Sequence, residues 1–198
     1  MESLSVFRLV VGLGNPGDRY VGTRHNAGFC VADELARRCA VAFSFDSRWN
    51  ADMASCGGRM LMKPRTFMNL SGEAVSHYAR YHRIPPAEVL VILDDASLPL
   101  GDLRIRRSGS SGGHNGLESV LVHLGTEAVP RLRLGIGAPP EKIPLDEFVL
   151  SRFTDAELSV FAEAVLRGAD AVDSANARGL EAAMNQLNNP TNHQNPKP

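Results

Sequence analysis

The chain has 198 residues, 43% of them hydrophobic and 22% charged, with a formal net charge of −1. This size and composition are typical of one ordinary globular domain with a core of its own. The near-zero charge excludes a protein that binds nucleic acid through its overall charge. Residues 7–13 are apolar but too few for a signal peptide or a membrane span, so we expect a cytoplasmic protein.

The three cysteines, Cys30, Cys39 and Cys56, form no C-x-x-C pattern, and an odd number cannot all pair. We predict that they are reduced thiols in the core or at the surface, as is usual in the cytosol. The expected thiol state and the expected location therefore support each other.

The first half of the chain predicts strands and helices in alternation. Residues 7–13 form a continuous β-branched run, typical of a buried strand. Apolar spacing then predicts a helix over residues 27–38, a hairpin within residues 41–56 and a short strand over residues 59–63. A second helix is predicted over residues 71–81, before a pair of prolines.

The middle of the chain continues the alternation. Residues 89–93 read as a buried strand, and residues 103–107 alternate apolar and basic side chains, as a half-exposed strand does. Residues 117–124 predict a helix that follows a glycine-rich run, and residues 131–136 alternate again as a strand.

The last part of the chain is predicted to be helical. Thr154-Asp155-Ala156-Glu157 is a capping box that opens a helix running to residue 165 or beyond, and a further helix covers residues 180–187. Residues 188–198 are rich in Asn and Pro and have no apolar anchor, so we expect a disordered tail after a folded domain of residues 1–187. The interleaved elements predict an α/β fold, a single globular domain with a central mixed, mostly parallel β-sheet flanked by α-helices.

Gly12-Leu13-Gly14-Asn15-Pro16-Gly17 follows the first strand with the G-x-G-x-x-G spacing of dinucleotide sites. The context differs, because a proline lies inside the motif and residues 18–22 read as a loop where a helix should begin. The acidic residues about twenty positions on lie in a predicted helix instead of at the end of a strand. The sequence therefore disfavours a dinucleotide site, and we predict no cofactor.

Gly109-Ser110-Ser111-Gly112-Gly113 matches the G-x-S-x-G motif of a nucleophilic serine. The residues before it are too basic for a buried strand, and the histidines after it lie too close, in a helix or in the tail. A flexible Gly/Ser loop is therefore the favoured interpretation. His77 and His82 lie five positions apart on one helix, which is not a shared-face spacing, and we predict no metal site.

His25 lies in a loop between Arg24 and Asn26, just before a predicted helix. Asp94 follows the buried strand 89–93, and ligand sites in open α/β sheets gather at the carboxyl ends of strands. A carboxylate there can accept a hydrogen bond from one ring nitrogen of His25, leaving the other nitrogen to take a proton from water. The alternative is an ordinary surface histidine, and the pattern alone leaves both open.

Asn69 and Asn115 stand at the starts of predicted helices. Asparagine there often caps the helix. Amide side chains and free N–H groups at helix N-termini also donate to a developing oxyanion, so a catalytic role is the second interpretation.

Arg104, Arg106 and Arg107 cluster within four positions of a half-exposed strand. Residues 1–110 carry a net charge of +3 and the remainder −4, so the basic residues are concentrated in the part that holds this cluster. Such a face suits a salt-sensitive contact with phosphates, and a solvated strand edge is the alternative.

Taken together, these motifs resemble the bacterial-type peptidyl-tRNA hydrolase family, from about residue 8 to residue 153. Their order and spacing argue against a chance resemblance. The runs that carry it are residues 11–17 (VGLGNPG), Tyr20, residues 23–28 (TRHNAG), residues 63–72 (KPRTFMNLSG), Asp94-Asp95, Gly101, residues 112–117 (GGHNGL) and residues 131–137 (RLRLGIG).

The resemblance implies hydrolysis of the ester that joins a peptide to the 3′ end of tRNA, which recycles both. It implies that His25 is the general base that activates water and that Asp94 orients it. Asn15, Asn69 and Asn115 are implied to position the peptide, the water or the tetrahedral intermediate, with Met68, Tyr20 and Asn26 nearby and His114 lining the cleft. Tyr20 offers a stacking face to the terminal ribonucleotide. The candidates for a phosphate-binding face are Arg104, Arg106, Arg131 and Arg133.

The chain departs from the family pattern beside Asp94, where Leu93 and Ser97 stand in place of polar or acidic residues. The substitutions leave the His25–Asp94 pair intact and put the local tuning of Asp94 in question. Two alternatives are an RNA-binding protein without catalysis, as in plant organellar relatives that serve RNA splicing, and an esterase for a small ester. The polar set around His25 favours the hydrolase. We expect a monomer that binds peptidyl-tRNA at the acceptor end and the phosphate backbone and binds no membrane.

Overall fold

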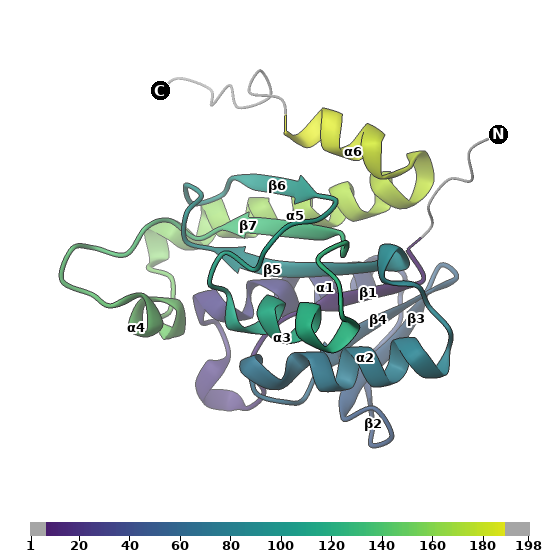
Figure 1. The fold of residues 1–198 in the computed structure, drawn as a ribbon. Helices are drawn as coiled ribbons and strands as arrows, with labels where there is room; N and C mark the ends of the chain where they lie inside the picture. The colour runs from purple at the N-terminus through teal and green to yellow at the C-terminus, as the bar shows by residue number, and fades with distance from the viewer. Residues whose placement is uncertain (1–6, 189–198) are drawn as a thin grey trace.

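The apolar runs of the chain form the middle of a seven-stranded sheet, in a computed structural model that describes residues 7–188. The strand order is β2-β3-β4-β1-β5-β7-β6 (Figure 1). The strands are β1 (Leu9–Gly12), β2 (Ser44–Asp46), β3 (Ala51–Cys56), β4 (Arg59–Pro64), β5 (Val89–Asp95), β6 (Leu103–Arg106) and β7 (Arg131–Gly135). β4, β1, β5 and β7 pair in parallel, and the outer pairs are antiparallel, which confirms the predicted mixed sheet.

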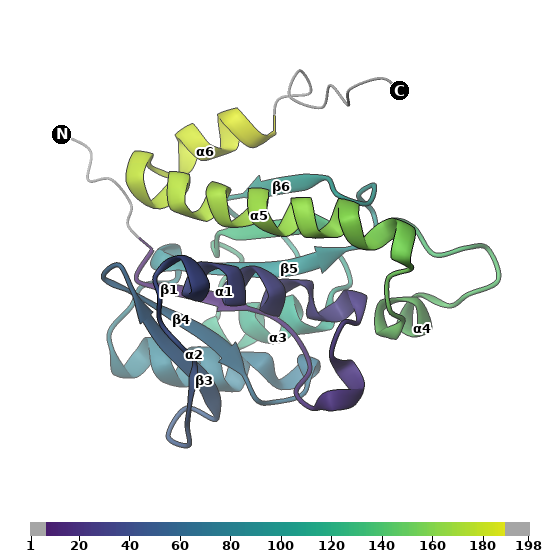
Figure 2. The ribbon, with the colours of Figure 1, turned by 180° about the vertical axis from the view of Figure 1, so that it is seen from behind.

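Helices cover both faces of this sheet. α2 (Ser71–Tyr81) and α3 (Asn115–Leu124) lie on one face, and α1 (Ala27–Arg38) and α5 (Asp155–Arg178) lie on the other (Figures 1 and 2). α6 (Leu180–Leu187) packs on α5 and β6. Both faces of β1 and β5 are therefore buried, because alternate side chains enter two separate cores. This two-sided burial explains why their sequences are continuously apolar.

The parallel strands bring several loops to one edge of the sheet. β1 ends at Gly12 and β5 at Asp95, and the start of α1 packs directly against both. A Cβ atom on Gly28 would lie 2.3 Å from the carbonyl oxygen of Ile92, so only glycine allows this approach. The close packing holds the 3₁₀ turn η2 (Arg24–Asn26), and with it His25, beside the end of β5.

The predicted helices over residues 27–38, 71–81 and 180–187 are confirmed residue for residue. The capping box at Thr154 is present and opens α5. α4 (Leu145–Leu150) is not predicted by the sequence pattern, because six residues are too few to show a helical period. Two further 3₁₀ turns, η1 (Asp18–Tyr20) and η3 (Met68–Leu70), lie in loops near the same edge.

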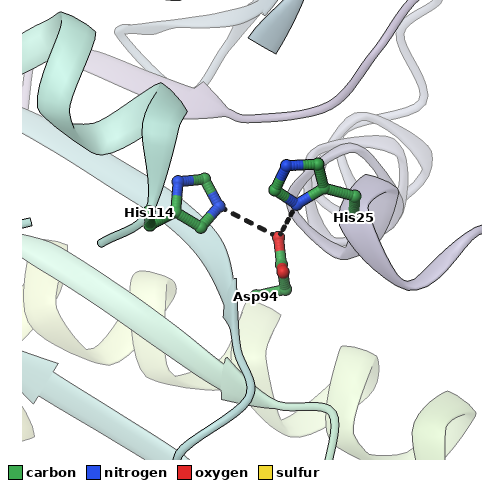
Figure 3. Close-up of side chains that lie close together, drawn as sticks. All are labelled: His25, Asp94 and His114. Carbon is green, nitrogen blue, oxygen red and sulfur yellow. Dashed lines mark hydrogen bonds and ion pairs between the residues drawn. The ribbon is translucent and has the colours of Figure 1, made fainter. Parts of the chain in front are cut away.

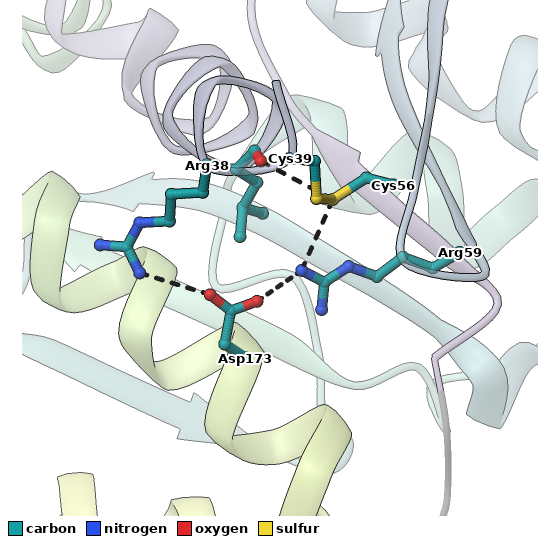
Figure 4. The surroundings of a disulfide bond; sticks show 6 residues. Arg38, Cys39, Cys56, Arg59 and Asp173 are labelled. Atoms are coloured by element: carbon teal, nitrogen blue, oxygen red, sulfur yellow. Dashed lines mark hydrogen bonds and ion pairs between the residues drawn. A yellow bond between two sulfur atoms is a disulfide. The ribbon is translucent and has the colours of Figure 1, made fainter. Parts of the chain in front are cut away.

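Cys39 and Cys56 form a disulfide, with their Cα atoms 5.6 Å apart (Figure 4). The prediction that all three cysteines are reduced is wrong for this pair. Cys39 follows the last turn of α1 and Cys56 ends β3, so tertiary packing joins residues 17 positions apart that no spacing rule relates. Cys30 is free, and burial raises the pKa of its thiol to about 11.

Asn188 falls in the predicted disordered tail, but its side-chain amide exchanges two hydrogen bonds with the backbone of Ile105, at 3.1 and 2.9 Å. The rest of the predicted tail, residues 189–198, lies outside the described residues. Within residues 7–188, no helix combines the length and the hydropathy that a membrane span requires.

Candidate active site

Asp94 lies at the buried end of β5, with 3% of its surface exposed. Its Oδ1 atom lies 2.9 Å from Nδ1 of His25 and 3.0 Å from Nε2 of His114 (Figure 3). The two rings are 4.9 Å apart between centroids. The predicted pair of His25 and Asp94 is therefore present as geometry, and a second histidine shares the same carboxylate oxygen.

Hydrogen bonds set the tautomer of His114. Its Nδ1 atom accepts from the backbone N–H of Leu117, 3.2 Å away, so the side chain caps the N-terminus of α3. The acceptor nitrogen carries no proton, so Nε2 must carry it and donate to Asp94. His114 thus accepts through Nδ1 and donates through Nε2.

His25 has the opposite arrangement. Its Nδ1–H donates to Asp94, which leaves Nε2 as the nitrogen with a free lone pair. No other hydrogen bond engages the ring among residues 7–188. A nitrogen of this kind accepts a proton from a water molecule.

The charge of Asp94 is held in place by its neighbours. Burial alone would raise the pKa of this carboxyl group, but the electrostatic attraction and hydrogen bonds of His114 and His25 outweigh it and hold the pKa well below its usual range. Asp94 is therefore a carboxylate at neutral pH.

A cavity of about 440 Å³ opens over this cluster. Its lining joins the end of β5, the glycine-rich loop before α3, and α4. The lining residues are His25, Leu93, Asp94, Asp95, Ala96, Ser97, Ser111, Gly112, Gly113, His114, Asn115, Arg133, Leu145, Asp146 and Val149. The contribution of α4 is not evident from the sequence, where its only signal is a run of three apolar residues at positions 148–150.

Leu93 and Ser97, the two departures from the family pattern, both line this cavity. Ser97 Oγ donates to Oδ1 of Asp95 at 2.7 Å, and Asp95 in turn forms an ion pair with Arg133 at 2.6 Å. The serine therefore contacts the neighbour of Asp94 and makes no hydrogen bond to Asp94 itself among the described residues.

Asn15 lies in a buried hydrogen-bonded group with Asn26 and Met68, and none of the three is part of the cavity lining. Its Oδ1 accepts from the backbone N–H of Met68 at 2.8 Å. Asn26 accepts from the backbone N–H of Asn15 at 2.8 Å and donates to its carbonyl at 3.0 Å. Asn26 is thus committed to the backbone of Asn15, whereas Nδ2 of Asn15 has no acceptor within residues 7–188 and is the group left to meet a ligand.

Asn69 and Tyr20 are not part of the cavity lining. Asn69 is exposed in η3 and does not cap α2, whose N-cap residue is Leu70. Tyr20 is half-buried, and the guanidinium of Arg19 lies 4.6 Å from its ring centre. Asn115 is the first residue of α3 and does line the cavity, while His114 takes the capping position.

The four candidate phosphate-binding arginines do not share one environment. Arg131 is 2% exposed, and its guanidinium donates to the carbonyl oxygens of residues 109, 110, 127 and 129. Burial also lowers its pKa. A phosphate cannot reach it, so its proposed role is corrected to anchoring the loop before α3. Arg104 and Arg106 are exposed on β6, and Arg133 lies half-buried at the cavity.

His25, Asp94 and His114 are also close enough to serve as a set of metal ligands. The hydrogen bond from Leu117 to Nδ1 of His114 places the proton on the nitrogen that would bind the ion, which favours a hydrogen-bonded group over a metal site. The absence of a metal requirement stays a prediction.

The serines in the cavity are not activated as nucleophiles. Ser111, the serine of the G-x-S-x-G match, accepts from the backbone N–H of Gly113 at 3.3 Å, and Ser97 donates to Asp95. Among residues 7–188, no serine or cysteine forms a hydrogen bond with His25. The class that an α/β fold with a carboxylate-bound histidine at such a cavity fits best is a hydrolase with a histidine as general base.

The comparisons with known proteins agree with this class. The family model for peptidyl-tRNA hydrolase matches residues 9–196. The peptidyl-tRNA hydrolase of Synechococcus sp. (strain JA-3-3Ab) is 46% identical over 185 residues, covering 91% of this chain and 82% of that protein. The peptidyl-tRNA hydrolase of Chloroflexus aggregans is 48% identical, covering 91% and 98%. The crystal structure of peptidyl-tRNA hydrolase from Acinetobacter baumannii matches with a TM-score of 0.87 and 32% identity, covering 95% of this chain and 97% of that one. The chain belongs to the peptidyl-tRNA hydrolase family and is an ester hydrolase.

Proposed function

We propose that the cavity hydrolyses the ester between a peptide and the 3′ ribose of tRNA, with His25 as the general base. The observation that carries the proposal is the hydrogen bond from Nδ1 of His25 to Asp94, which leaves Nε2 free to bind water. Nε2 takes a proton from that water while its oxygen attacks the ester carbonyl. The tetrahedral intermediate then collapses, and the imidazolium returns the proton to the ribose oxygen that leaves.

Asp94 stabilises the imidazolium that forms during the attack. Its depressed pKa keeps it ionised, and its burial strengthens its interaction with a positive ring. His114 donates a second hydrogen bond to the same oxygen atom and so fixes the carboxylate between the two rings.

The ester itself explains why no covalent nucleophile is required. An alcohol leaving group makes the carbonyl reactive enough for direct attack by water, and a general base contributes roughly 10²–10⁴-fold. Asn115 and Nδ2 of Asn15 are the amide donors that we assign to the developing oxyanion and to the peptide backbone. Asn69, Met68 and Tyr20 remain proposed contacts of the substrate outside the cavity lining.

The tRNA is proposed to lie across the exposed side of β6 and to reach the cavity at Arg133 of β7. Arg104 and Arg106 point out of β6, and Arg104 pairs in register with Arg133 of β7, which reaches the cavity. This arrangement supports a phosphate path that leads to the ester. We further propose that the protein acts as a monomer in the cytoplasm, although the disulfide removes the support that reduced cysteines gave to this location.

The test is release of N-blocked amino acids from charged tRNA by the wild-type protein, with uncharged tRNA as competitor. Hydrolysis that uncharged tRNA inhibits is the expected result. Binding of tRNA without hydrolysis would favour the alternative of a non-catalytic RNA-binding protein, and hydrolysis indifferent to tRNA would indicate a small-ester esterase.

A further inference from the structure

Arg24 immediately precedes His25 in η2, and its charged side chain is buried, with 4% of its surface exposed. The guanidinium lies between the rings of Phe148 and Phe153, 4.5 Å from the centre of each. Two aromatic faces around one cation form a specific site for arginine. The proposed reaction assigns no role to this residue.

The guanidinium joins three segments that are far apart in sequence. It donates to Oε2 of Glu157 at 2.7 Å, to Oγ of Ser151 at 3.2 Å and to the carbonyl oxygen of Ile136 at 3.3 Å. The backbone N–H of Arg24 also donates to the carbonyl oxygen of Ser151 at 3.0 Å. Arg24 thus connects η2 to the start of α5, to the exit of β7 and to the end of α4.

Glu157 is itself part of the capping box of α5. The Oε2 atom that binds Arg24 also accepts from the backbone N–H and the hydroxyl of Thr154, at 2.8 and 2.9 Å. The hydrogen bond from Arg24 is the main reason that the pKa of Glu157 is lowered to about 2. The pair is therefore charged at any working pH, and it rests on a rigid helix start.

α4 contacts this arginine through its buried residue and its end. The helix has six residues, and no side chain caps its N-terminus at Pro144. Phe148, its buried residue, packs on the guanidinium, and Ser151 at its end binds it. Three other residues of α4, Leu145, Asp146 and Val149, line the cavity and form what we call the α4 wall.

We propose that Arg24 is a positioning residue that holds the α4 wall against the catalytic histidine. In this way the 3₁₀ turn η2 determines the position of both the general base and the opposite wall of the substrate cavity. The inference rests on the proposed ester hydrolysis. His25 keeps its own hydrogen bond to Asp94, and the next residue, Asn26, stays bonded to Asn15, so loss of Arg24 displaces the wall more than the base.

The chain provides a matched control in Arg59. This arginine is also buried, at 7% exposure, and also binds a carboxylate of α5, Asp173, at 2.5 Å (Figure 4). It starts β4, at the opposite edge of the sheet from the site, because β4 runs parallel to β1. Arg59→Met therefore removes a comparable ion pair without touching the cavity.

The experiment compares the wild type, Arg24→Met and Arg59→Met on N-acetyl-phenylalanyl-tRNA and N-acetyl-glycyl-tRNA. For Arg24→Met we expect KM for the phenylalanyl substrate to rise about 10-fold, with a smaller rise for the glycyl substrate and kcat within about 2-fold. Arg24→Lys should restore part of the effect, because it keeps the charge but not the forked donors. Arg59→Met should lower the melting temperature and leave KM unchanged.

A second readout does not depend on catalysis. Lys142 is exposed just before α4, and the only other lysines of the chain are Lys63 and Lys197. Cleavage at Lys142 by a lysine-specific protease should be several-fold faster in Arg24→Met than in the wild type or Arg59→Met. Should Arg24→Met fail to fold, Ser151→Ala is the substitute, because Ser151 is exposed and its loss removes one hydrogen bond of the guanidinium. Ser151→Ala must then raise KM for the phenylalanyl substrate and speed cleavage at Lys142.

Unchanged KM and unchanged cleavage in the Arg24 or Ser151 variants would overturn the inference, as would equal effects in Arg59→Met. These results are distinct from failure of the proposed function, in which the wild type itself would hydrolyse neither substrate.

Discussion

Asp94 binds two histidines through one carboxylate oxygen, and each histidine uses a different ring nitrogen for this bond. The capping bond from Leu117 leaves Nε2 of His114 to donate to Asp94, while His25 donates through Nδ1 and has no hydrogen bond at Nε2 among residues 7–188. The hydrogen-bond partners of each histidine therefore determine which of its ring nitrogens is free to accept a proton.

This assignment predicts the effect of His114→Asn. Asparagine is a good N-cap residue, so α3 should still form and the protein should fold. The shorter side chain loses the hydrogen bond to Asp94, and a hydrogen bond to a charged group is worth about 1.5–3 kcal/mol, so kcat should fall at least about 10-fold. Wild-type kcat in a well-folded His114→Asn protein would show that the second histidine does not support the carboxylate.

The sequence predicted which residues meet at the site better than it predicted what each one does. His25, Asp94, His114 and Asn115 were identified from motifs, and all four line the cavity. Arg131 was misassigned because a strand pattern does not reveal that residues 109 and 110 supply carbonyl acceptors to its guanidinium. Hydrogen bonds between segments far apart in the chain are set by tertiary packing, which periodicity does not encode.

At the scale of elements, the strands of the sheet were predictable from the sequence, whereas the contacts that join distant elements were not. Continuous apolar runs identified β1 and β5, and helical spacing gave the bounds of α1, α2 and α6. α4 was missed because six residues are too few to show a helical period, and its contact with Arg24 joins segments far apart in the chain.

The disulfide between α1 and β3 predicts a redox-dependent stability. The disulfide closes a loop between residues 17 positions apart. For a loop of this length, replacing Cys39 and Cys56 by serine should lower the free energy of unfolding by about 3 kcal/mol. Turnover should persist, because the 12 residues of α1 separate Cys39 from His25 by about 18 Å. Urea unfolding of the double variant and of the wild type, each with and without reductant, measures the effect.

Cys30→Ser is the matched control for this experiment, because Cys30 is free and its variant should keep the full sensitivity to reductant. Alkylation of all three thiols in the protein before any reduction would contradict the disulfide.

At the scale of the whole molecule, the fold places a basic strand face beside the cavity on a chain that is nearly neutral overall. Replacing Arg104 and Arg106 together by alanine should raise KM for charged tRNA. The slope of log KM against log salt should fall by about 1 for each phosphate that the protein no longer neutralises. kcat should be unchanged, since neither residue lines the cavity.

Arg37→Ala provides the comparison, because Arg37 is exposed on α1, on the other face of the sheet. An equal change in the salt slope for Arg37→Ala would indicate that tRNA does not select the β6 face.

The central claim is that His25 activates water through Nε2, and chemical rescue tests it most directly. The rate of N-acetyl-aminoacyl-tRNA hydrolysis is measured for the wild type and for His25→Ala, with and without added imidazole. We predict that His25→Ala folds normally, loses roughly 10²–10⁴-fold in kcat and regains part of this rate in proportion to imidazole concentration. A folded His25→Ala protein that turns over at the wild-type rate without imidazole would contradict the claim.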